Sequence, residues 1–232
     1  GRIGETYVLY YSLAIWGEET GELAPGIGVA TSATPAGPFT DHGKLFLSDE
    51  IGVRNSIDPY LFTEDGRHYL FWGSWGGIWG IELTADGLAV KPGAQKFQIG
   101  GSAYEAAWIV KIDERYWFFG STGSCCEGLW STYNVTVAQS DSLRGPYAGR
   151  DGRTLMNNGA TEILRGADGV AGPGHISLTR DDAGDYWMLY HAWSKADGYG
   201  ERQLFVDRLR FDADGWPRVN NGYPSFQGET LE

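Results

Sequence analysis

Four windows of the sequence contain an aromatic-led run of apolar residues that is typical of a β-strand. They are "TYVLYYS" (6–12), "HYLFWGS" (68–74), "RYWFFGS" (115–121) and "DYWMLYHA" (185–192). The last three windows each follow a second strand-like run and a charged turn, in "DPYLFTEDGR", "EAAWIVKIDE" and "HISLTRDDAG". Each of these three pairs of runs therefore predicts a β-hairpin.

The three predicted hairpins share one internal spacing. A polar residue stands eleven positions before the leading tyrosine of the second strand, as Asp58 before Tyr69, Glu105 before Tyr116 and His175 before Tyr186. A single ionisable residue at the start of a strand is common in β-proteins. Three of them at the same offset indicate equivalent positions in a repeated unit.

The spacing of the aromatic strands predicts the fold. They recur at intervals of 62, 47 and 70 residues, which fits propeller blades of about 40–50 residues with loops inserted. Further strand-like runs, such as "GIWGIEL" and "TYNVTVAQS", follow two of the hairpins. We therefore predict an all-β fold, with residues 1–232 as a single, partial β-propeller domain of roughly four blades. The first strand of each blade lines the central channel, so Asp58, Glu105 and His175 are expected to meet at one end of it.

The first unit differs from the other three. A position eleven residues before Tyr7 would precede Gly1. We therefore expect this unit to lack its opening strand, and the chain to be part of a larger propeller or of a ring that another chain completes.

Composition narrows the class of ligand. The 35 glycines and 14% aromatic residues in 232 favour short strands and tight turns. A formal net charge of −12 argues against nucleic acid as a partner, because no cationic face displaces its counterions. The sequence contains no run of 18 apolar residues, which is the length that would predict a membrane span. A neutral ligand fits better, and an aromatic-rich surface suits sugar rings.

Cys125 and Cys126 are neighbours in the sequence. Bridging adjacent residues closes a strained ring, so we expect free thiols or an unusual vicinal disulfide. The favoured interpretation is two small, buried side chains within a strand.

A Glu, an Asp and a His around a channel mouth favour acid–base chemistry on a sugar. Glycoside cleavage needs a carboxylic acid that protonates the leaving oxygen, and inversion needs a carboxylate base about 6.5–9.5 Å away to activate water. "SAYEAAW" surrounds Glu105 with alanines and a tryptophan, and such an apolar setting favours a protonated carboxyl group. Glu105 is therefore the predicted general acid.

The sequence resembles glycoside hydrolase family 43 over nearly its whole length, and most closely the endo-α-1,5-L-arabinanases of that family. The resemblance lies in "RNSIDPYLF", "YLFWGSWGGIWGIEL", "SAYEAAWI", "GSCCEGLWSTYNVTVAQSDSLRGPY", "GPGHISL" and "YWMLYHAW". It implies a five-bladed propeller that hydrolyses arabinan by inversion, of which this chain covers roughly four blades.

Site roles follow from the same resemblance. Asp58 matches the carboxylate that tunes and orients the acid, and Glu105 matches the acid itself. His175 matches the histidine beside a central metal, usually calcium, which is often bound through water. Asn55 and Ser74 match positions that border the sugar, and Trp75 is a candidate stacking platform.

The resemblance also implies that the general base is an Asp on the first strand of the first blade, which we expect upstream of Gly1. No other carboxylate is an obvious substitute, including Asp49, Glu50, Glu127 and Asp151. Two alternatives stay open: an exo-acting α-L-arabinofuranosidase or β-xylosidase of the same family, or a non-catalytic carbohydrate-binding propeller. The expected partner is arabinan or an arabino-oligosaccharide. Because such a polymer is too large to enter a cell, we expect a secreted or periplasmic protein.

Overall fold

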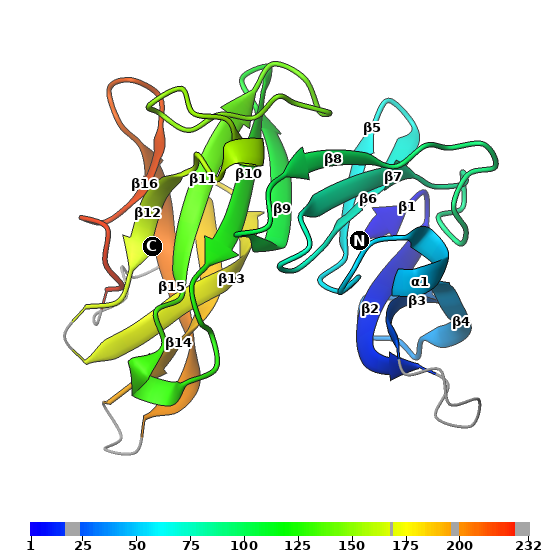
Figure 1. Ribbon diagram of the computed structural model, residues 1–232, viewed down its shortest axis with the longest axis horizontal. Coiled ribbons are helices and arrows are strands. Elements are labelled where there is room, and N and C mark those ends of the chain that lie inside the picture. Colours follow the sequence, from blue (N-terminus) through cyan, green and yellow to red (C-terminus); the bar gives the residue numbers. More distant parts are fainter. Residues whose placement is uncertain (17–23, 168, 196–199, 226–232) are drawn as a thin grey trace.

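The computed structural model describes residues 1–16, 24–167, 169–195 and 200–225, and they form four antiparallel, four-stranded sheets (Figure 1). The first sheet contains β1 (Arg2–Ile3), β2 (Thr6–Trp16), β3 (Ala24–Ser32) and β4 (Thr40–Leu47). The second contains β5 (Tyr60–Glu64), β6 (Arg67–Trp72), β7 (Ile78–Glu82) and β8 (Phe97–Gly100). The third contains β9 (Glu105–Ile112), β10 (Arg115–Thr122), β11 (Asn134–Ser140) and β12 (Thr161–Arg165). The fourth contains β13 (Val170–Arg180), β14 (Tyr186–Ser194), β15 (Glu201–Phe211) and β16 (Pro217–Val219).

Each sheet pairs its strands in chain order, which is the meander of a propeller blade. The three predicted hairpins are β5–β6, β9–β10 and β13–β14. Two of them close through two-residue turns, Asp65–Gly66 and Asp113–Glu114, in which both residues have positive φ. Turns of this kind match the right-handed twist of the flanking strands. The prediction of a four-blade propeller fragment is therefore confirmed.

Apolar clusters hold consecutive sheets together. One cluster joins the first sheet to the second and includes Phe46 and Trp72, whose ring centroids are 5.1 Å apart. Another joins the second to the third, where Phe62 and Tyr116 are 6.1 Å apart. A further cluster, which includes Trp117, joins the third to the fourth. Each fully buried large side chain contributes about 1.5–3 kcal/mol, so these interfaces fix the angular order of the sheets.

No such cluster among the described residues joins the fourth sheet to the first. Both of these sheets instead expose large apolar side chains. Leu9 and Leu13 of β2 are 45% and 42% exposed, and Leu204 and Val206 of β15 are 71% and 38% exposed. The ring of sheets is therefore open between β13–β16, on the left of Figure 1, and β1–β4, on its right.

Two expectations from the sequence need correction. The first unit does not lack its opening strand altogether, because Arg2 and Ile3 of β1 pair with Tyr7 and Thr6 of β2. A two-residue strand carries too little pattern to be recognised in a sequence.

The cysteines give the second correction. Cys125 and Cys126 form a vicinal disulfide in the irregular segment after β10, and Cys126 is exposed. The interpretation as buried residues of a strand is therefore wrong, and the alternative of a vicinal bridge is correct.

Within the described ranges, three short helices lie between the strands: α1 (Ser48–Ile51), η1 (Gly128–Trp130) and η2 (Leu155–Asn157). None of the helices in the described part of the chain has the length and apolar character that crossing a membrane requires.

Candidate active site

The inner strands β5, β9 and β13 position the three residues that share the eleven-residue spacing. Asp58 lies two residues before β5, and Glu105 is the first residue of β9. His175 lies inside β13 and not at its start, because β13 extends back to Val170 through shifts of register on both sides of Gly174. These irregularities turn the backbone near His175 away from a regular ladder.

Backbone hydrogen bonds bring the three residues together. Oδ2 of Asp58 accepts a hydrogen bond of 3.2 Å from the N–H of Ala106, the neighbour of Glu105. The N–H of His175 donates to Oγ of Ser121 at 2.9 Å, and Ser121 is the cross-strand partner of Glu105. The charges of His175 and Glu105 both act on Asp58. The predicted convergence of these three side chains is therefore confirmed.

Glu105 is 8% exposed, and its carboxylate is held by a neighbouring blade. The hydroxyl of Ser74, itself 1% exposed, donates a hydrogen bond of 2.7 Å to Oε2 of Glu105. Asn55 in turn donates from Nδ2 to the carbonyl oxygen of Ser74 at 3.1 Å. The N–H of Trp75 donates to the carbonyl oxygen of Tyr104 at 3.2 Å. Because the serine is anchored on both sides, its hydroxyl fixes the direction of the carboxylate.

Burial raises the pKa of Asp58 above its ordinary value of 3.8. Among the smaller effects, the positive field of His175 and the N–H of Ala106 lower this pKa, while the negative charge of Glu105 raises it. Desolvation disfavours the ionised form and outweighs the two favourable contacts. The site therefore contains a pair of carboxyl groups, those of Asp58 and Glu105, and acid–base cleavage of a glycoside uses carboxyl groups of this kind.

Five residues of the site have a left-handed backbone. These are Asn55 (φ 55°), Asp58 (φ 58°), Trp75 (φ 56°), Ala106 (φ 55°) and His175 (φ 51°). Non-glycine residues rarely adopt this conformation, which costs of order 1–3 kcal/mol and persists only where surrounding contacts impose it. Its concentration at the inner ends of successive blades indicates that the backbone is bent to aim these side chains.

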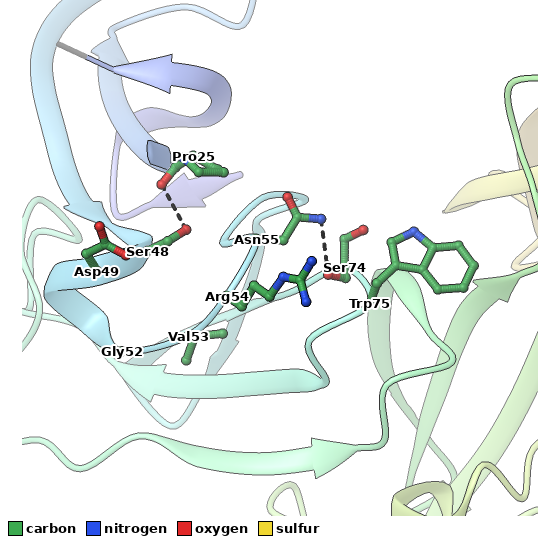
Figure 2. Close-up of a pocket in the computed structure, with 9 residues that line it drawn as sticks. All are labelled: Pro25, Ser48, Asp49, Gly52, Val53, Arg54, Asn55, Ser74 and Trp75. Atoms are coloured by element: carbon green, nitrogen blue, oxygen red, sulfur yellow. Dashed lines mark hydrogen bonds between the residues drawn. The ribbon is translucent and has the colours of Figure 1, made fainter. Parts of the chain in front are cut away.

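A cavity of about 820 Å³ opens beside the acid, between the first and second sheets. Figure 2 shows α1 on one side and Trp75 on the other, with Arg54 between them. The cavity is lined by Pro25, Ser48, Asp49, Gly52, Val53, Arg54, Asn55, Ser74 and Trp75. Three predicted sugar-binding residues, Asn55, Ser74 and Trp75, therefore share one wall. Since Ser74 also donates a hydrogen bond to Glu105, the side chain of this one residue lies between the cavity and the acid.

Sequence reasoning missed Tyr133 and His191. Tyr133 is 1% exposed, and its ring stacks on His191 with centroids 5.8 Å apart and planes 14° apart. Gly174 makes room for this ring, because a Cβ atom there would lie 2.2 Å from Cδ1 of Tyr133. Burial and then the negative charge of Glu105 raise the pKa of Tyr133. For His191 the sequence did contain a signal: it stands five residues after the leading tyrosine of its strand, as Ser74 and Ser121 do.

The family resemblance places a metal, usually calcium, beside His175. No three His, Cys, Asp or Glu side chains of this part of the chain gather as metal ligands would. Calcium takes six to eight oxygen ligands, whereas His175 offers nitrogen and is exposed. An ion beside His175 would therefore need water molecules for most of its ligands.

Known proteins share both the sequence and the fold. A model of the family "Glycosyl hydrolases family 43" matches residues 2–217. The extracellular exo-α-(1→5)-L-arabinofuranosidase ArbA of Cellvibrio japonicus is 31% identical over 92% of this chain and 66% of its own length. The extracellular endo-α-(1→5)-L-arabinanase 1 of Bacillus subtilis is 31% identical over 91% of this chain and 64% of its own length.

Among solved structures, that of the α-L-arabinanase of Cellvibrio cellulosa superimposes with a TM-score of 0.83 at 28% identity. The match covers 95% of this chain and 75% of that one. The same arabinanase in complex with arabinohexaose gives 0.81 at 27% identity, covering 94% of this chain and 74% of that one. The chain therefore forms four blades of a five-bladed propeller fold, and it spans about two thirds of the length of these curated relatives.

Proposed function

The chain belongs to family 43 of the glycosyl hydrolases. From this premise we propose that the protein hydrolyses α-1,5-linked L-arabinan with inversion of configuration, and that it cleaves bonds in the interior of the polysaccharide. The endo-arabinanase of Bacillus subtilis and the arabinohexaose complex of a structural relative support this substrate. A neutral glycan also suits a molecule with a formal net charge of −12.

One observation carries the proposal: Glu105 is buried next to Asp58 and accepts a hydrogen bond from Ser74, which lines a cavity. In the proposed reaction Glu105 protonates the leaving glycosidic oxygen while the bond to the anomeric carbon breaks. Ser74 keeps the carboxyl group aimed at that oxygen. Asp58 acts on the acid through its charge and through the peptide that follows Glu105.

Inversion also requires a carboxylate that removes a proton from the attacking water. In this proposal the base opens the inner strand of a fifth blade, as the family resemblance implies, and Asp58 remains the orienting carboxylate. The cavity beside Ser74 accepts part of the glycan, with Trp75 as its stacking face.

The test uses the full-length protein and linear 1,5-arabinan. We expect arabino-oligosaccharides whose new reducing ends first appear with the inverted anomeric configuration in proton NMR. Glu105→Gln should lower kcat on arabinan about 10²- to 10⁴-fold, the usual contribution of a general acid. It should retain most activity on a 2,4-dinitrophenyl arabinotrioside, whose leaving group needs no proton. Retention of configuration rejects the inverting mechanism. Binding of arabinan without turnover selects the non-catalytic alternative instead.

An exo-acting enzyme is the second candidate, because one curated relative is named an exo-α-(1→5)-L-arabinofuranosidase. Timed product profiles separate the two modes. Endo action gives a ladder of oligosaccharides at early times, whereas exo action gives a single short product from the first minutes.

A calcium ion beside His175 is also part of the proposal and is supported by the family resemblance, with water molecules completing its coordination shell. Calcium should raise the melting temperature of the protein and not that of His175→Ala, as expected for a ligand that binds only the folded state.

We further propose a location outside the cytoplasm, since the two curated relatives above are named extracellular.

A further inference from the structure

The four blades carry one residue at an equivalent position in, or just after, the second strand. It stands five residues after the leading tyrosine, and it is Ser12, Ser74, Ser121 and His191 in chain order. In the third and fourth sheets this residue faces the inner strand of its own blade, where Ser121 pairs with Glu105 and His191 with Gly174. The fold therefore places all four at the inner end of a blade.

Each of the three serines also reaches the inner strand of the following blade. Oγ of Ser12 accepts the N–H of Asp58 at 2.9 Å. The hydroxyl of Ser74 donates to Oε2 of Glu105 at 2.7 Å. Oγ of Ser121 accepts the N–H of His175 at 2.9 Å. The same contact thus recurs at three interfaces: the serine of one blade forms a hydrogen bond with the ionisable residue at the inner end of the next blade.

His191 occupies the same position in the fourth sheet, but no following sheet meets it among the residues that the structure describes. Among the described residues, its Nδ1 is the one buried side-chain nitrogen or oxygen atom that lacks a hydrogen-bond partner. Buried polar atoms are almost always paired, and one without a partner calls for an explanation. Ser12 and Ser121 both serve as acceptors of a backbone N–H, and an unprotonated Nδ1 is an acceptor of the same kind.

We propose that Nδ1 of His191 accepts the backbone N–H of the residue that opens the inner strand of a fifth blade, which closes the ring between the fourth sheet and the first. His191 is then a positioning residue for that blade. Only the identification of the positioned residue as the general base rests on the proposed function.

A fifth sheet of the same protein is the occupant that the structure favours. The two end sheets expose Leu9, Leu13, Leu204 and Val206, which are the apolar faces that a further sheet would cover. Three apolar clusters already hold three of the five interfaces of a five-bladed ring, and a fifth sheet in the opening would supply the remaining two. The chain covers 75% of a structural relative, which leaves about the share of one blade.

Amide hydrogen exchange in the full-length protein tests the proposal. His191→Phe keeps a ring against Tyr133 but has no acceptor, whereas His191→Asn retains one. In His191→Phe we expect exchange at the opening residue of the fifth inner strand to accelerate about 2- to 12-fold, the effect of one net hydrogen bond. His191→Asn should remain close to the wild type. Since exchange needs no turnover, the result does not depend on whether arabinan is cleaved.

Two serine variants calibrate the measurement within the chain itself. Ser12→Ala should accelerate exchange at the N–H of Asp58, and Ser121→Ala at the N–H of His175, because each removes the acceptor seen in the structure. If His191→Phe fails to fold, His191→Ser against His191→Ala forms a second pair that differs by one hydroxyl. The proposal is overturned if both serine variants respond while the amide of the fifth strand exchanges equally in the variants with and without an acceptor.

Discussion

The carboxylate of Asp58 accepts a hydrogen bond of 3.2 Å from the backbone N–H of Ala106, the residue that follows Glu105. One peptide unit thus connects two carboxyl groups that come from different blades. Ala106, which donates this bond, has a left-handed backbone with a φ of 55°. A change in the charge of Asp58 therefore acts directly on the geometry of the predicted acid.

Asp58→Asn tests the electrostatic cost of this arrangement. The pKa of Asp58 in the folded protein is raised above 3.8, mainly by burial, so the folded state binds more protons than the unfolded state above that pH. The free energy of unfolding of the wild type should therefore fall as the pH rises from 3.8 through the folded pKa. Asparagine lacks this titration and can still accept the N–H of Ala106. We expect the variant to gain stability relative to the wild type between pH 3 and pH 7, measured by urea unfolding at each pH. A difference that stays constant with pH would exclude a raised pKa.

Ser74→Ala tests the hydrogen bond to Glu105 as part of the proposed chemistry. A hydrogen bond to a charged group contributes about 1.5–3 kcal/mol, so kcat/KM on arabinan should fall about 10- to 150-fold. Ser56→Ala is the matched control, because Ser56 is also fully buried but its hydroxyl contacts Val53 and Trp72 and not the acid. Steady-state kinetics of both variants should show the loss in Ser74→Ala alone. Equal losses would assign the effect to packing.

The fold could be predicted from the sequence because its signal is repeated. Aromatic strands and turn residues recur in each blade, and the spacing from the opening residue to the leading tyrosine is eleven residues in three of them. That spacing also located Asp58, Glu105 and His175, since equivalent strands carry their residues to one axis. The two-residue β1 escaped prediction because it is shorter than any periodic pattern.

Contacts between blades were harder to predict than positions within a blade. Ser121 and Tyr133 belong to the site through a bulge in β9–β10 and through the space that Gly174 leaves. Neither feature has a sequence period. His191 has the same offset as three serines, but the change of residue type conceals the equivalence. The vicinal disulfide likewise depends on the local path of the chain after β10, which residue pattern alone does not determine.

Trp75→Ala tests the cavity as a binding surface. Trp75 is 50% exposed and lines the wall that Asn55 and Ser74 share. An aromatic contact contributes about 0.5–1.5 kcal/mol, so the dissociation constant for arabinohexaose should rise about 2- to 12-fold in isothermal titration calorimetry. Trp130→Ala is the control, because Trp130 is 86% exposed and does not line this cavity. If both variants weaken binding equally, the cavity is not the sugar-binding surface.

His191→Phe tests how far His191 makes the free energy of unfolding of this chain depend on pH. Burial, the charge of Arg202 on β15 and that of His175 on β13 lower the pKa of His191 from 6.5 to about 4. Between these values the unfolded state binds more protons, so the free energy of unfolding of the wild type should fall as the pH drops from 6.5 to 4. Phenylalanine does not titrate and keeps a ring against Tyr133, so the variant should lose less stability over this window. Thermal unfolding at pH 7, 5.5 and 4 measures the difference, which should grow toward low pH. A constant difference would mean that His191 titrates alike in the folded and unfolded chain, and that its imidazole is not desolvated against Tyr133.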